Sequence, residues 1–424
     1  MAKTITGKQV GDSYYRVEHP SGLTVLLYPK EHCSTTYAIF GTRYGSIDNC
    51  FQRSDEAGPE SVPEGIAHYL EHKLFESEEG DAFERFSKTG ASANAFTSFE
   101  STCYLFSTTD QVYQSLEILL DFVQSPYFTE ETVRKEQGII GQEIKMYDDD
   151  PQWRVMFNYL KAMYHSHPIR EDIAGTVESI AKITPELLYR CYNTFYNLGN
   201  MVLAIAGNFQ VDKALAVCDK MLKPAAPVTV KRVFPQEPDT IVQPVVEERL
   251  SVASPLFQFG FKEPGADQPR SEKDVAATEV LLETLASDAS PLFRRLLDQG
   301  LVNESSFSYE YFEGNGYATV MFSGESKDPQ AVAQAILEEV ERFQREGIPA
   351  EAFERSKRAL YGELVAALNS TGSIANGLVN MHLKGRELFT YIDSLASLRL
   401  EDGEERLRKV FQRERSVLSV ILPH

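Results

Sequence analysis

We predict from the sequence an α+β protein of two tandem homologous domains, each a sheet with helices packed on it, joined by a Pro-rich linker. The length of 424 residues, with 42% hydrophobic and 25% charged residues, is typical of two or three globular domains. The two halves of the chain show weak self-similarity. Between them, a segment with little helical periodicity is typical of an extended linker; residues 222–247 contain Pro224, Pro227, Pro235, Pro238 and Pro244.

Strands are predicted from short apolar runs, and helices from apolar residues that recur every three or four positions. In the first half, these patterns predict strands at residues 23–28, 103–107 and 201–206 and helices at 61–75, 112–123 and 129–143. In the second half, they predict strands at 256–261, 319–323 and 417–422 and helices at 331–343 and 349–363. At a common offset of 220, Glu131 and Glu143 match Glu351 and Glu363. We therefore expect a first domain over residues 1–221 and a diverged copy of it over 248–424.

The formal net charge of −20 opposes binding to nucleic acid or to an anionic membrane, because both are recognised by cationic groups. It favours neutral or basic ligands, although solubility alone explains most of these carboxylates equally well. The first residues lack the apolar run of a signal peptide, and no stretch approaches the length of a membrane span. We therefore expect a cytoplasmic protein. Five scattered cysteines without a CxxC pair predict neither a disulfide framework nor a thiolate zinc cluster.

The most informative segment is SVPEGIAHYLEHKLF, residues 61–75. We expect a helix that Ser61 or a neighbour caps, with Pro63 in its first turn. A core-facing stripe repeats every four residues, at Ile66, Leu70 and Leu74. His68, Glu71 and His72 then lie together on another face of this helix.

His68, Glu71 and His72 stand at positions i, i+3 and i+4 of the predicted helix, so their side chains share a face. Two imidazoles one turn apart can bind one zinc ion, and a carboxylate between them can reach the attacking water without binding the metal. This HxxEH arrangement is the inverted zincin pattern. The alternative is a pair of solvated or core histidines. A chance HxxEH is expected in roughly one such sequence in a hundred, so we favour the metal site.

Glu143 is the candidate for the third protein ligand that a catalytic zinc ion requires. It lies on the helix predicted at residues 129–143, where Glu136, seven residues earlier, shares its face. The residues alone leave the alternative open, and favour it about two to one, that both are ordinary surface carboxylates.

With these motifs, the chain resembles the insulinase/pitrilysin family of inverzincin zinc metallopeptidases, especially its short two-domain bacterial members similar to the β subunit of mitochondrial processing peptidase. Residues 65–75 resemble the metal helix of the family, and residues 91–97 with 102–104 resemble its substrate-binding strand. Glu136 and Glu143 match its downstream acidic pair. The resemblance covers nearly the whole chain.

The resemblance implies that Glu143 is the third zinc ligand and that Glu136 is a supporting carboxylate of the catalytic site. The sequence departs from the family pattern in two ways, and neither departure removes a metal ligand. The 71 positions from His72 to Glu143 are a few fewer than in the family, and Lys73 stands where a methionine is common. Family members also pair the active domain with a copy that has lost the motif, and residues 279–285 contain no histidine here.

The expected reaction is zinc-dependent hydrolysis of peptides or unfolded segments held in a chamber between the domains. Zinc would polarise the scissile carbonyl and lower the pKa of its water, with Glu71 as the general base. Residues 92–106 are predicted as a strand whose edge can bind an extended peptide through main-chain hydrogen bonds. Asn94, Ala95 and Phe96 are the candidate substrate contacts, with ordinary sheet residues as an equally favoured alternative.

Two other functions fit less well. A non-catalytic scaffold or peptide-binding member of the same family is disfavoured because His68, Glu71, His72 and Glu143 are all intact. A structural metal site is disfavoured because three protein ligands and a general base describe an open site.

The resemblance also implies an arginine and a tyrosine in the second domain that hold the substrate near the metal. Leu296 and Asn303 stand at those positions. Three candidates lie nearby but out of register, and a shifted helix could still recruit them, with about one chance in three: Arg294, Arg295 and Tyr309. We therefore expect this chain to be the metal-bearing subunit of a heterodimer with a related subunit that lacks the metal motif, or else a homodimer.

Overall fold

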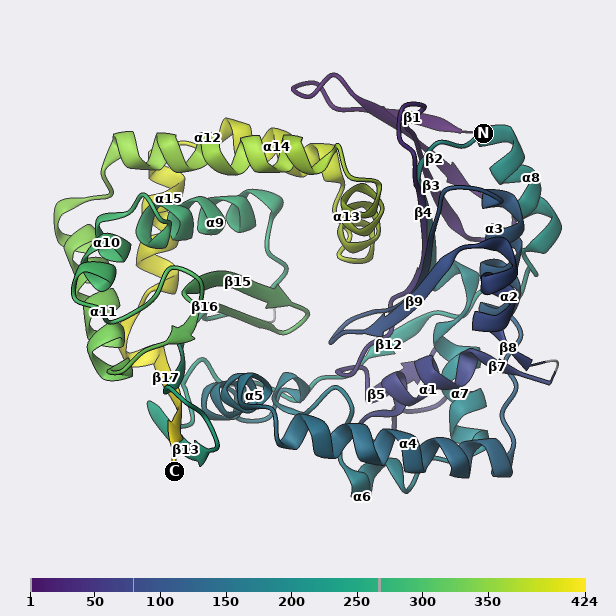
Figure 1. Ribbon diagram of the computed structural model, residues 1–424, viewed down its shortest axis with the longest axis horizontal. Coiled ribbons are helices and arrows are strands. Elements are labelled where there is room, and N and C mark those ends of the chain that lie inside the picture. Colours follow the sequence, from purple (N-terminus) through teal and green to yellow (C-terminus); the bar gives the residue numbers. More distant parts are fainter. Residues whose placement is uncertain (1, 79, 266–267) are drawn as a thin grey trace. The chain divides into compact units, whose positions relative to one another are not determined.

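Helices and sheets occur throughout the chain, which confirms the α+β class (Figure 1). The computed structural model describes residues 2–78, 80–265 and 268–424. The chain forms two compact units, and each unit contains segments from both halves of the sequence. Unit 1 comprises Met1–Ile144, Glu171–Val233 and Val365–Thr390; unit 2 comprises Lys145–Arg170, Phe234–Leu364 and Tyr391–His424. None of the described helices is long and apolar enough to cross a membrane.

Unit 1 is built on a seven-stranded sheet with the order β1-β2-β3-β11-β4-β10-β9. Its strands are β1 (Lys3–Thr6), β2 (Ser13–Glu18), β3 (Thr24–Pro29), β4 (Thr36–Thr42), β9 (Ser92–Thr97), β10 (Thr102–Thr108) and β11 (Met201–Gly207). The pair β3–β11 is parallel, and the other pairs are antiparallel. The central strand β11 is an apolar run that is buried along its whole length, as expected of a strand covered on both faces.

The other elements of unit 1 surround this sheet. Its helices are α1 (Ile66–Leu74), α2 (Ala82–Thr89), α3 (Val112–Val123), α6 (Val177–Ile180), α7 (Pro185–Phe195), α8 (Val211–Met221) and α13 (Thr371–Leu383). Its short strands are β5 (Cys50–Arg53), β6 (Glu60–Ser61), β7 (Glu76–Ser77), β8 (Gly80–Asp81) and β12 (Val230–Arg232). The expected single strand at residues 92–106 is wrong, because the chain turns at residues 98–101 and forms the antiparallel pair β9–β10. Ser98 makes this turn by bonding to Ser101.

Unit 2 is built on a five-stranded sheet with the order β13-β17-β14-β16-β15. Its strands are β13 (Val245–Leu250), β14 (Leu256–Lys262), β15 (Ser308–Gly314), β16 (Tyr317–Glu325) and β17 (Ser416–Pro423). Its helices include α5 (Pro151–Met163), α9 (Glu272–Ala286), α10 (Pro291–Asp298), α11 (Pro329–Glu346) and α15 (Leu400–Val410). The pair β13–β17 is parallel, and the rest are antiparallel. The same pattern occurs in strands β3-β11-β4-β10-β9 of unit 1, as expected of a repeat.

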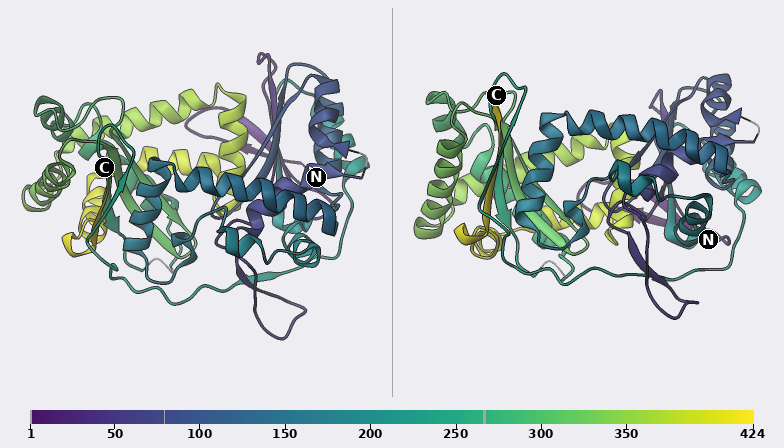
Figure 2. Two further views of the ribbon diagram at one scale, coloured as in Figure 1. Left: turned by 60° about the horizontal axis from the view of Figure 1, so that its bottom comes forward. Right: turned by 90° about the horizontal axis from the view of Figure 1, so that it is seen from below.

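The repeat extends to helices 220 positions apart, some of which contribute residues to both units. The predicted pair is α4 (Glu130–Asp148), drawn in blue in both views of Figure 2, and α12 (Ala350–Ala367). Both helices continue past their expected ends. The division of the chain into the two units falls within these helices, after Ile144 and after Leu364. Helix α14 (Leu388–Ser397) also contributes residues to both units. The expected sequence domains, 1–221 and 248–424, stay a prediction about the sequence repeat.

Helices α5 and α13 each have thirteen residues and begin 220 positions apart, yet each packs on the sheet of the other half of the sequence. Helix α5, from the first half, packs on β17, β14 and β13 of unit 2. Helix α13, from the second half, packs on β11, β4 and β3 of unit 1 (Figure 1). The two repeats therefore exchange one equivalent helix.

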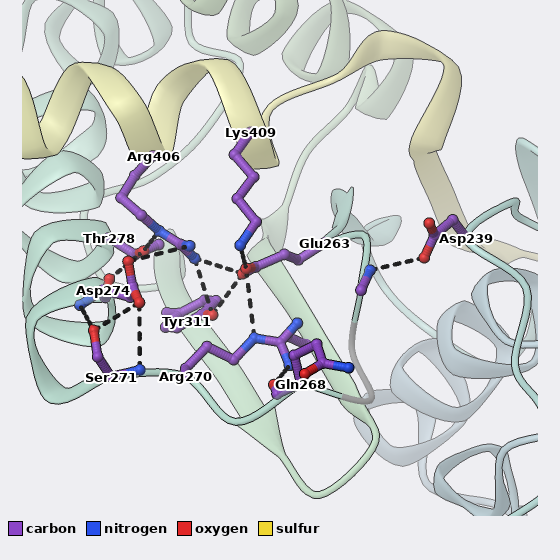
Figure 3. Close-up of polar contacts among 12 residues, drawn as sticks. Asp239, Glu263, Gln268, Arg270, Ser271, Asp274, Thr278, Tyr311, Arg406 and Lys409 are labelled. Atoms are coloured by element: carbon purple, nitrogen blue, oxygen red, sulfur yellow. Dashed lines mark hydrogen bonds and ion pairs between the residues drawn. The ribbon is translucent and has the colours of Figure 1, made fainter.

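A buried charge cluster centred on Glu263 ties the elements of unit 2 together (Figure 3). The Glu263 carboxylate accepts hydrogen bonds from Arg406 Nη2 at 2.5 Å and from Tyr311 Oη at 2.6 Å. Arg270 and Lys409 lie 3.4 and 3.6 Å from its other oxygen. Burial alone would raise the pKa of Glu263, but the hydrogen bond and charge of Arg406 lower it below the usual range.

Candidate metal centre

Helix α1, which carries the HxxEH motif, begins at Ile66 rather than near Ser61. The expected cap at Ser61 and the expected place of Pro63 in the first turn are wrong, because Ser61 lies in strand β6 and Pro63 precedes the helix. Gly65 occupies the N-cap with φ 84° and no side-chain cap. A Cβ atom at Gly65 would lie 2.3 Å from the carbonyl oxygen of Ala174. The close approach of a distant loop therefore sets the start of this helix.

One side of α1 is held in the core of unit 1, as the sequence predicts. Ile66, Leu70 and Leu74 are all at most 3% exposed. Tyr69, also buried, donates a hydrogen bond from its hydroxyl to the carbonyl oxygen of Val133 in α4. This bond fixes α1 against the helix that carries Glu136 and Glu143.

The structure brings His68 and His72 of α1 together with Glu143 of α4. His68 Nε2 lies 3.6 Å from Glu143 Oε1, and His72 Nε2 lies 3.4 Å from Glu143 Oε2. One ligand atom from each side chain lies within 4.8 Å of the other two. His68 is buried, whereas His72 and Glu143 are partly exposed. The three groups therefore converge at a place that solvent can reach.

This donor set fits a zinc ion. Ligand atoms held about 2.0–2.2 Å from one zinc ion at tetrahedral angles stand roughly 3.3–3.6 Å apart. The separations of the Glu143 oxygens from His68 Nε2 and His72 Nε2 have this size. Two imidazoles with one carboxylate are also a ligand set that suits zinc among the divalent metals.

Glu136 contacts His72 on the ring nitrogen that faces away from Glu143. His72 Nδ1 lies 3.0 Å from Glu136 Oε1. A carboxylate that accepts the Nδ1–H of a ligating histidine fixes the tautomer and the ring orientation, and it makes Nε2 more basic. The geometry thus gives Glu136 a supporting position, which the spacing of seven residues could not specify.

Glu71 shares α1 with the two histidines but has another hydrogen-bond partner. Thr97 Oγ1, in β9, donates to Glu71 Oε2 at 3.2 Å. Burial raises the pKa of Glu71 to about 7, although the charge of His72 and the bond from Thr97 act to lower it. A carboxyl with a pKa near 7 can exchange protons at neutral pH, as a general base must. Thr97 was not assigned a role from the sequence, although it ends the segment that resembles the substrate-binding strand.

The two histidines have opposite pKa shifts. Burial and the neighbouring His72 lower the pKa of His68 to about 4. For His72, burial acts to lower the pKa, but hydrogen bonds with Glu136 and Glu143 outweigh it and raise the pKa to about 10. Because an imidazole must lose its proton to bind a metal, metal binding to this group is expected to release protons.

Strand β9 is the last strand of the seven-stranded sheet, and its residues alternate between exposed and partly buried. Asn94 and Ala95, two of the candidate substrate contacts, line a cavity of about 570 Å³ together with Glu71 and His72. Phe96, the third candidate, is 40% exposed. The same cavity is bordered by Phe75, Phe83 and the β7–β8 hairpin, which the sequence had not singled out.

The chain matches the models of two domains of one protein family. The model of the insulinase family, peptidase family M16, matches residues 60–177, and the model named peptidase M16 inactive domain matches residues 182–360. A Bacillus subtilis protein named "Uncharacterized zinc protease YmfH" is 39% identical over the full length of both chains. The chain belongs to the insulinase family, M16. Its resemblance to that family is thereby confirmed.

Two further proteins are similar to the chain. The crystal structure of a putative M16-like peptidase from Alicyclobacillus acidocaldarius is 36% identical, covers 100% of this chain and 98% of its own, and superposes with a TM-score of 0.92. The probable mitochondrial-processing peptidase subunit beta of Arabidopsis thaliana is 24% identical over 77% of this chain and 63% of its own.

The M16 inactive-domain match begins after the residues of the candidate metal centre. Within unit 2, helix α9 contains residues 279–285 and carries no histidine. Two of the three candidates for substrate contact there, Arg295 and Tyr309, already have partners. Arg295 bonds to Glu339 at 2.9 Å, and the Tyr309 hydroxyl donates to Glu283 at 2.5 Å. Leu296 is fully buried.

Proposed function

We propose that the protein is a zinc-dependent endopeptidase that cleaves peptides or unfolded segments. The observation that carries this proposal is the convergence of His68, His72 and Glu143 within 4.8 Å, on the same helix pair that presents Glu71 and Glu136. The relatives named zinc proteases support it.

In the proposed mechanism, His68, His72 and Glu143 hold the zinc ion, and Glu136 holds the His72 ring through Nδ1. When bound, Zn²⁺ supplies Lewis-acid chemistry: it polarises a carbonyl group and lowers the pKa of a water molecule. Glu71 accepts the proton of the attacking water and then donates it to the leaving amine nitrogen. The bond from Thr97 keeps one oxygen of Glu71 oriented during these transfers.

The substrate is proposed to bind as an extended segment along the edge of β9. The outer edge of a terminal strand can accept a peptide through main-chain hydrogen bonds, and side chains then fill adjacent cavities. Asn94 and Ala95 would place such a peptide beside Glu71, since all three line one cavity. The exposed ring of Phe96 is the third proposed contact.

A second candidate function is a non-catalytic peptide-binding or scaffold protein. It is favoured by the name of the family model that matches residues 182–360, peptidase M16 inactive domain. Both functions include peptide binding, but only the peptidase would cleave the bound peptide. A heterodimeric assembly and a cytoplasmic location remain predictions.

Turnover of a quenched peptide library distinguishes these functions. The purified chain, with its zinc content measured by elemental analysis, is incubated with the library, with a chelator, and with the chelator followed by added zinc. The peptidase proposal expects cleavage that the chelator abolishes and zinc restores. Peptide binding with one zinc per chain and no cleavage, either alone or with related subunits, would instead support the scaffold.

A further inference from the structure

Strand β13 ends the five-stranded sheet of unit 2, and its outer edge is open. Among the described residues, β13 pairs with β17 and with no other strand. In unit 1, the equivalent strand β3 is flanked by β2, which pairs with it antiparallel. Strand β3 is buried along nearly its whole length, whereas exposed and partly buried residues alternate along β13. The antiparallel strand that covers this edge in unit 1 thus has no counterpart in the described part of unit 2.

The open edge of β13 presents the backbone groups of three residues. In the parallel pair with β17, the carbonyl oxygen of Pro244 accepts a hydrogen bond from Leu418 at 2.9 Å. Because the backbone groups of successive residues in a strand point to opposite sides, the outward groups belong to Val245, Glu247 and Arg249. Val245 is also 46% exposed. Such an edge is a template for pairing with a strand of another chain.

The sequence of β13, VVEERL, is complementary to itself in one antiparallel register. This register places Glu248 on a two-fold axis. Glu247 of each chain then lies opposite Arg249 of the other, and the outward backbone groups of these residues can exchange hydrogen bonds. On the opposite face, Val246 of each chain lies opposite Leu250 of the other. Two pairs of opposite charge and two apolar pairs therefore stabilise this register.

The neighbouring register, centred on Glu247, is unfavourable. It would bring the two Glu247 side chains opposite each other, and like charges directly opposite on paired strands are destabilising. The outward residues thus select the register centred on Glu248.

The two Glu248 carboxylates that meet at the axis are each neutralised within their own chain. Arg154 and Asn158 of α5 donate hydrogen bonds to Glu248 at 2.8 and 2.7 Å. Burial acts to raise the pKa of Glu248, but the hydrogen bond from Arg154 lowers it below the usual range. Each carboxylate therefore approaches the axis together with a positive charge.

The two residues of the cross-chain pair make contacts in their own chain that leave them able to form it. Glu247 accepts a hydrogen bond from Gln330 at 3.2 Å, and Arg249 donates from Nη1 to the carbonyl oxygen of Pro423 at 2.6 Å. Both side chains are exposed. A guanidinium has several more donors, and a carboxylate accepts more than one hydrogen bond.

We propose that the chain forms a two-fold symmetric dimer through β13, in which the unit 2 sheets of two copies join into one continuous sheet. In such an interface the same surface is used by both chains, so the contact between Glu247 and Arg249 occurs twice. The proposal goes beyond the proposed peptidase function and does not depend on it, because the residues of the candidate metal centre all belong to unit 1.

Charge reversal tests the register. Sedimentation equilibrium of the full-length chain should show a mass that rises with concentration to that of two chains. Arg249→Glu and Glu247→Arg should each raise the dimer Kd about tenfold or more, because both attractive pairs become repulsive. The double variant Glu247→Arg, Arg249→Glu should restore association. Lys3→Glu is the matched control, since it reverses an exposed charge on β1, the edge strand of the unit 1 sheet, and should leave the Kd unchanged.

Glu247→Pro tests the backbone pairing. The N–H of residue 247 points away from β17, and edge strands tolerate a proline whose missing N–H would face solvent. Circular dichroism should show the same fold, and the dimer should be lost. A wild-type chain that stays monomeric at all concentrations would overturn the proposal. A dimer that persists in Arg249→Glu and Glu247→Arg would overturn it as well, whether or not Glu247→Pro folds.

Disulfide cross-linking tests the same register without a mass measurement. Chains with Glu247→Cys are mixed with chains with Arg249→Cys and oxidised. Hydrogen-bonded antiparallel residues have Cα atoms about 5.5 Å apart, a separation that a disulfide spans. The mixture should cross-link faster than either variant alone, and the separate variants control for the natural cysteines. Equal cross-linking of the mixture and the separate variants would overturn the proposed pairing.

Discussion

At the scale of single residues, Glu71 and His72 are neighbours in the sequence but face different partners. Thr97 donates to the carboxyl of Glu71, while the two ring nitrogens of His72 face Glu136 and Glu143. This difference separates a residue positioned to move a proton from one positioned to bind a metal. The two proposed roles can therefore be tested by separate substitutions.

Glu71→Gln is expected to retain zinc and the fold but to reduce kcat/KM by about 10²–10⁴, the usual contribution of a general base. His72→Ala should instead lose the metal. Zinc content, circular dichroism and turnover of one quenched peptide measure these effects together. Near-normal turnover by Glu71→Gln would show that the base has been assigned wrongly.

Glu143→Gln should weaken zinc binding more than Glu136→Gln does, because Glu143 faces both histidines and Glu136 faces only the Nδ1 of His72. Loss of a carboxylate that orients a ligating histidine typically costs about 10–100-fold in metal affinity or activity. Competition with a zinc-binding dye gives both affinities. If the two variants bind zinc equally well, the third ligand must be another residue.

At the scale of secondary-structure elements, the start of α1 depends on Gly65. Gly65→Ala would place a Cβ 2.3 Å from the Ala174 carbonyl oxygen in a left-handed conformation, so both the stability and the zinc affinity should fall. Gly90→Ala is the control: it shares the positive φ but meets nothing within 4 Å, and should cost only about 1–2 kcal/mol. Urea unfolding and zinc titration measure both variants. Equal losses would argue against a role for the close approach to Ala174.

In unit 2, Glu263 directly follows β14, and its cluster connects this position with β15, α9 and α15 through Tyr311, Thr278 and Arg406. Glu263→Gln would leave buried cations without their counter-charge, which typically costs about 3–5 kcal/mol. Glu341→Gln, which breaks the exposed pair with Arg413, should cost less than about 1 kcal/mol. Urea unfolding of the two variants gives the comparison. A small loss for Glu263→Gln would mean that the cluster contributes little to stability.

At the scale of the whole molecule, the exchange of α5 and α13 makes each unit depend on both halves of the chain. Helix α5 comes from the first half of the sequence but packs on the sheet of unit 2, whose strands come from the second half. Helix α13 comes from the second half but packs on the sheet of unit 1, whose strands come from the first half. Neither half of the sequence by itself contains all the elements of one unit. The organisation of the chain is thus more interleaved than a tandem repeat with a single linker suggests.

The partners of Arg295 and Tyr309 bear on whether the isolated chain is fully active. Because Glu339 and Glu283 already engage these two residues, we expect the chain alone to cleave unfolded peptides poorly at full zinc occupancy. A related M16 subunit that supplies an arginine and a tyrosine should raise turnover strongly, through contacts made in the transition state. Turnover is compared for the isolated chain and for the chain mixed with such a subunit.

The control for this prediction is the oligomeric state, measured by light scattering. Robust cleavage by a demonstrated monomer or homodimer, unaffected by Arg294→Ala, Arg295→Ala or Tyr309→Phe, would contradict the prediction that a related subunit completes the substrate site. Loss of that cleavage in one of these variants would show instead that the chain recruits its own residue.

The sequence by itself determined the α+β class, the repeat at an offset of 220 and the spacing of His68, Glu71 and His72. These features depend on local periodicity and on residue types, and both can be read along the chain. The buried stripe of α1 followed for the same reason. The sequence alone did not establish Glu143 as a ligand, because helix register identified its position but gave no distance from the histidines.

Only the tertiary structure decided where α1 begins, which nitrogen of His72 faces Glu136, and which sheet α5 and α13 cover. Each depends on contacts between residues far apart in the sequence, such as Gly65 with Ala174. Local propensity carries no information about such approaches, because the backbone of a distant loop excludes a side chain only after the chain has folded.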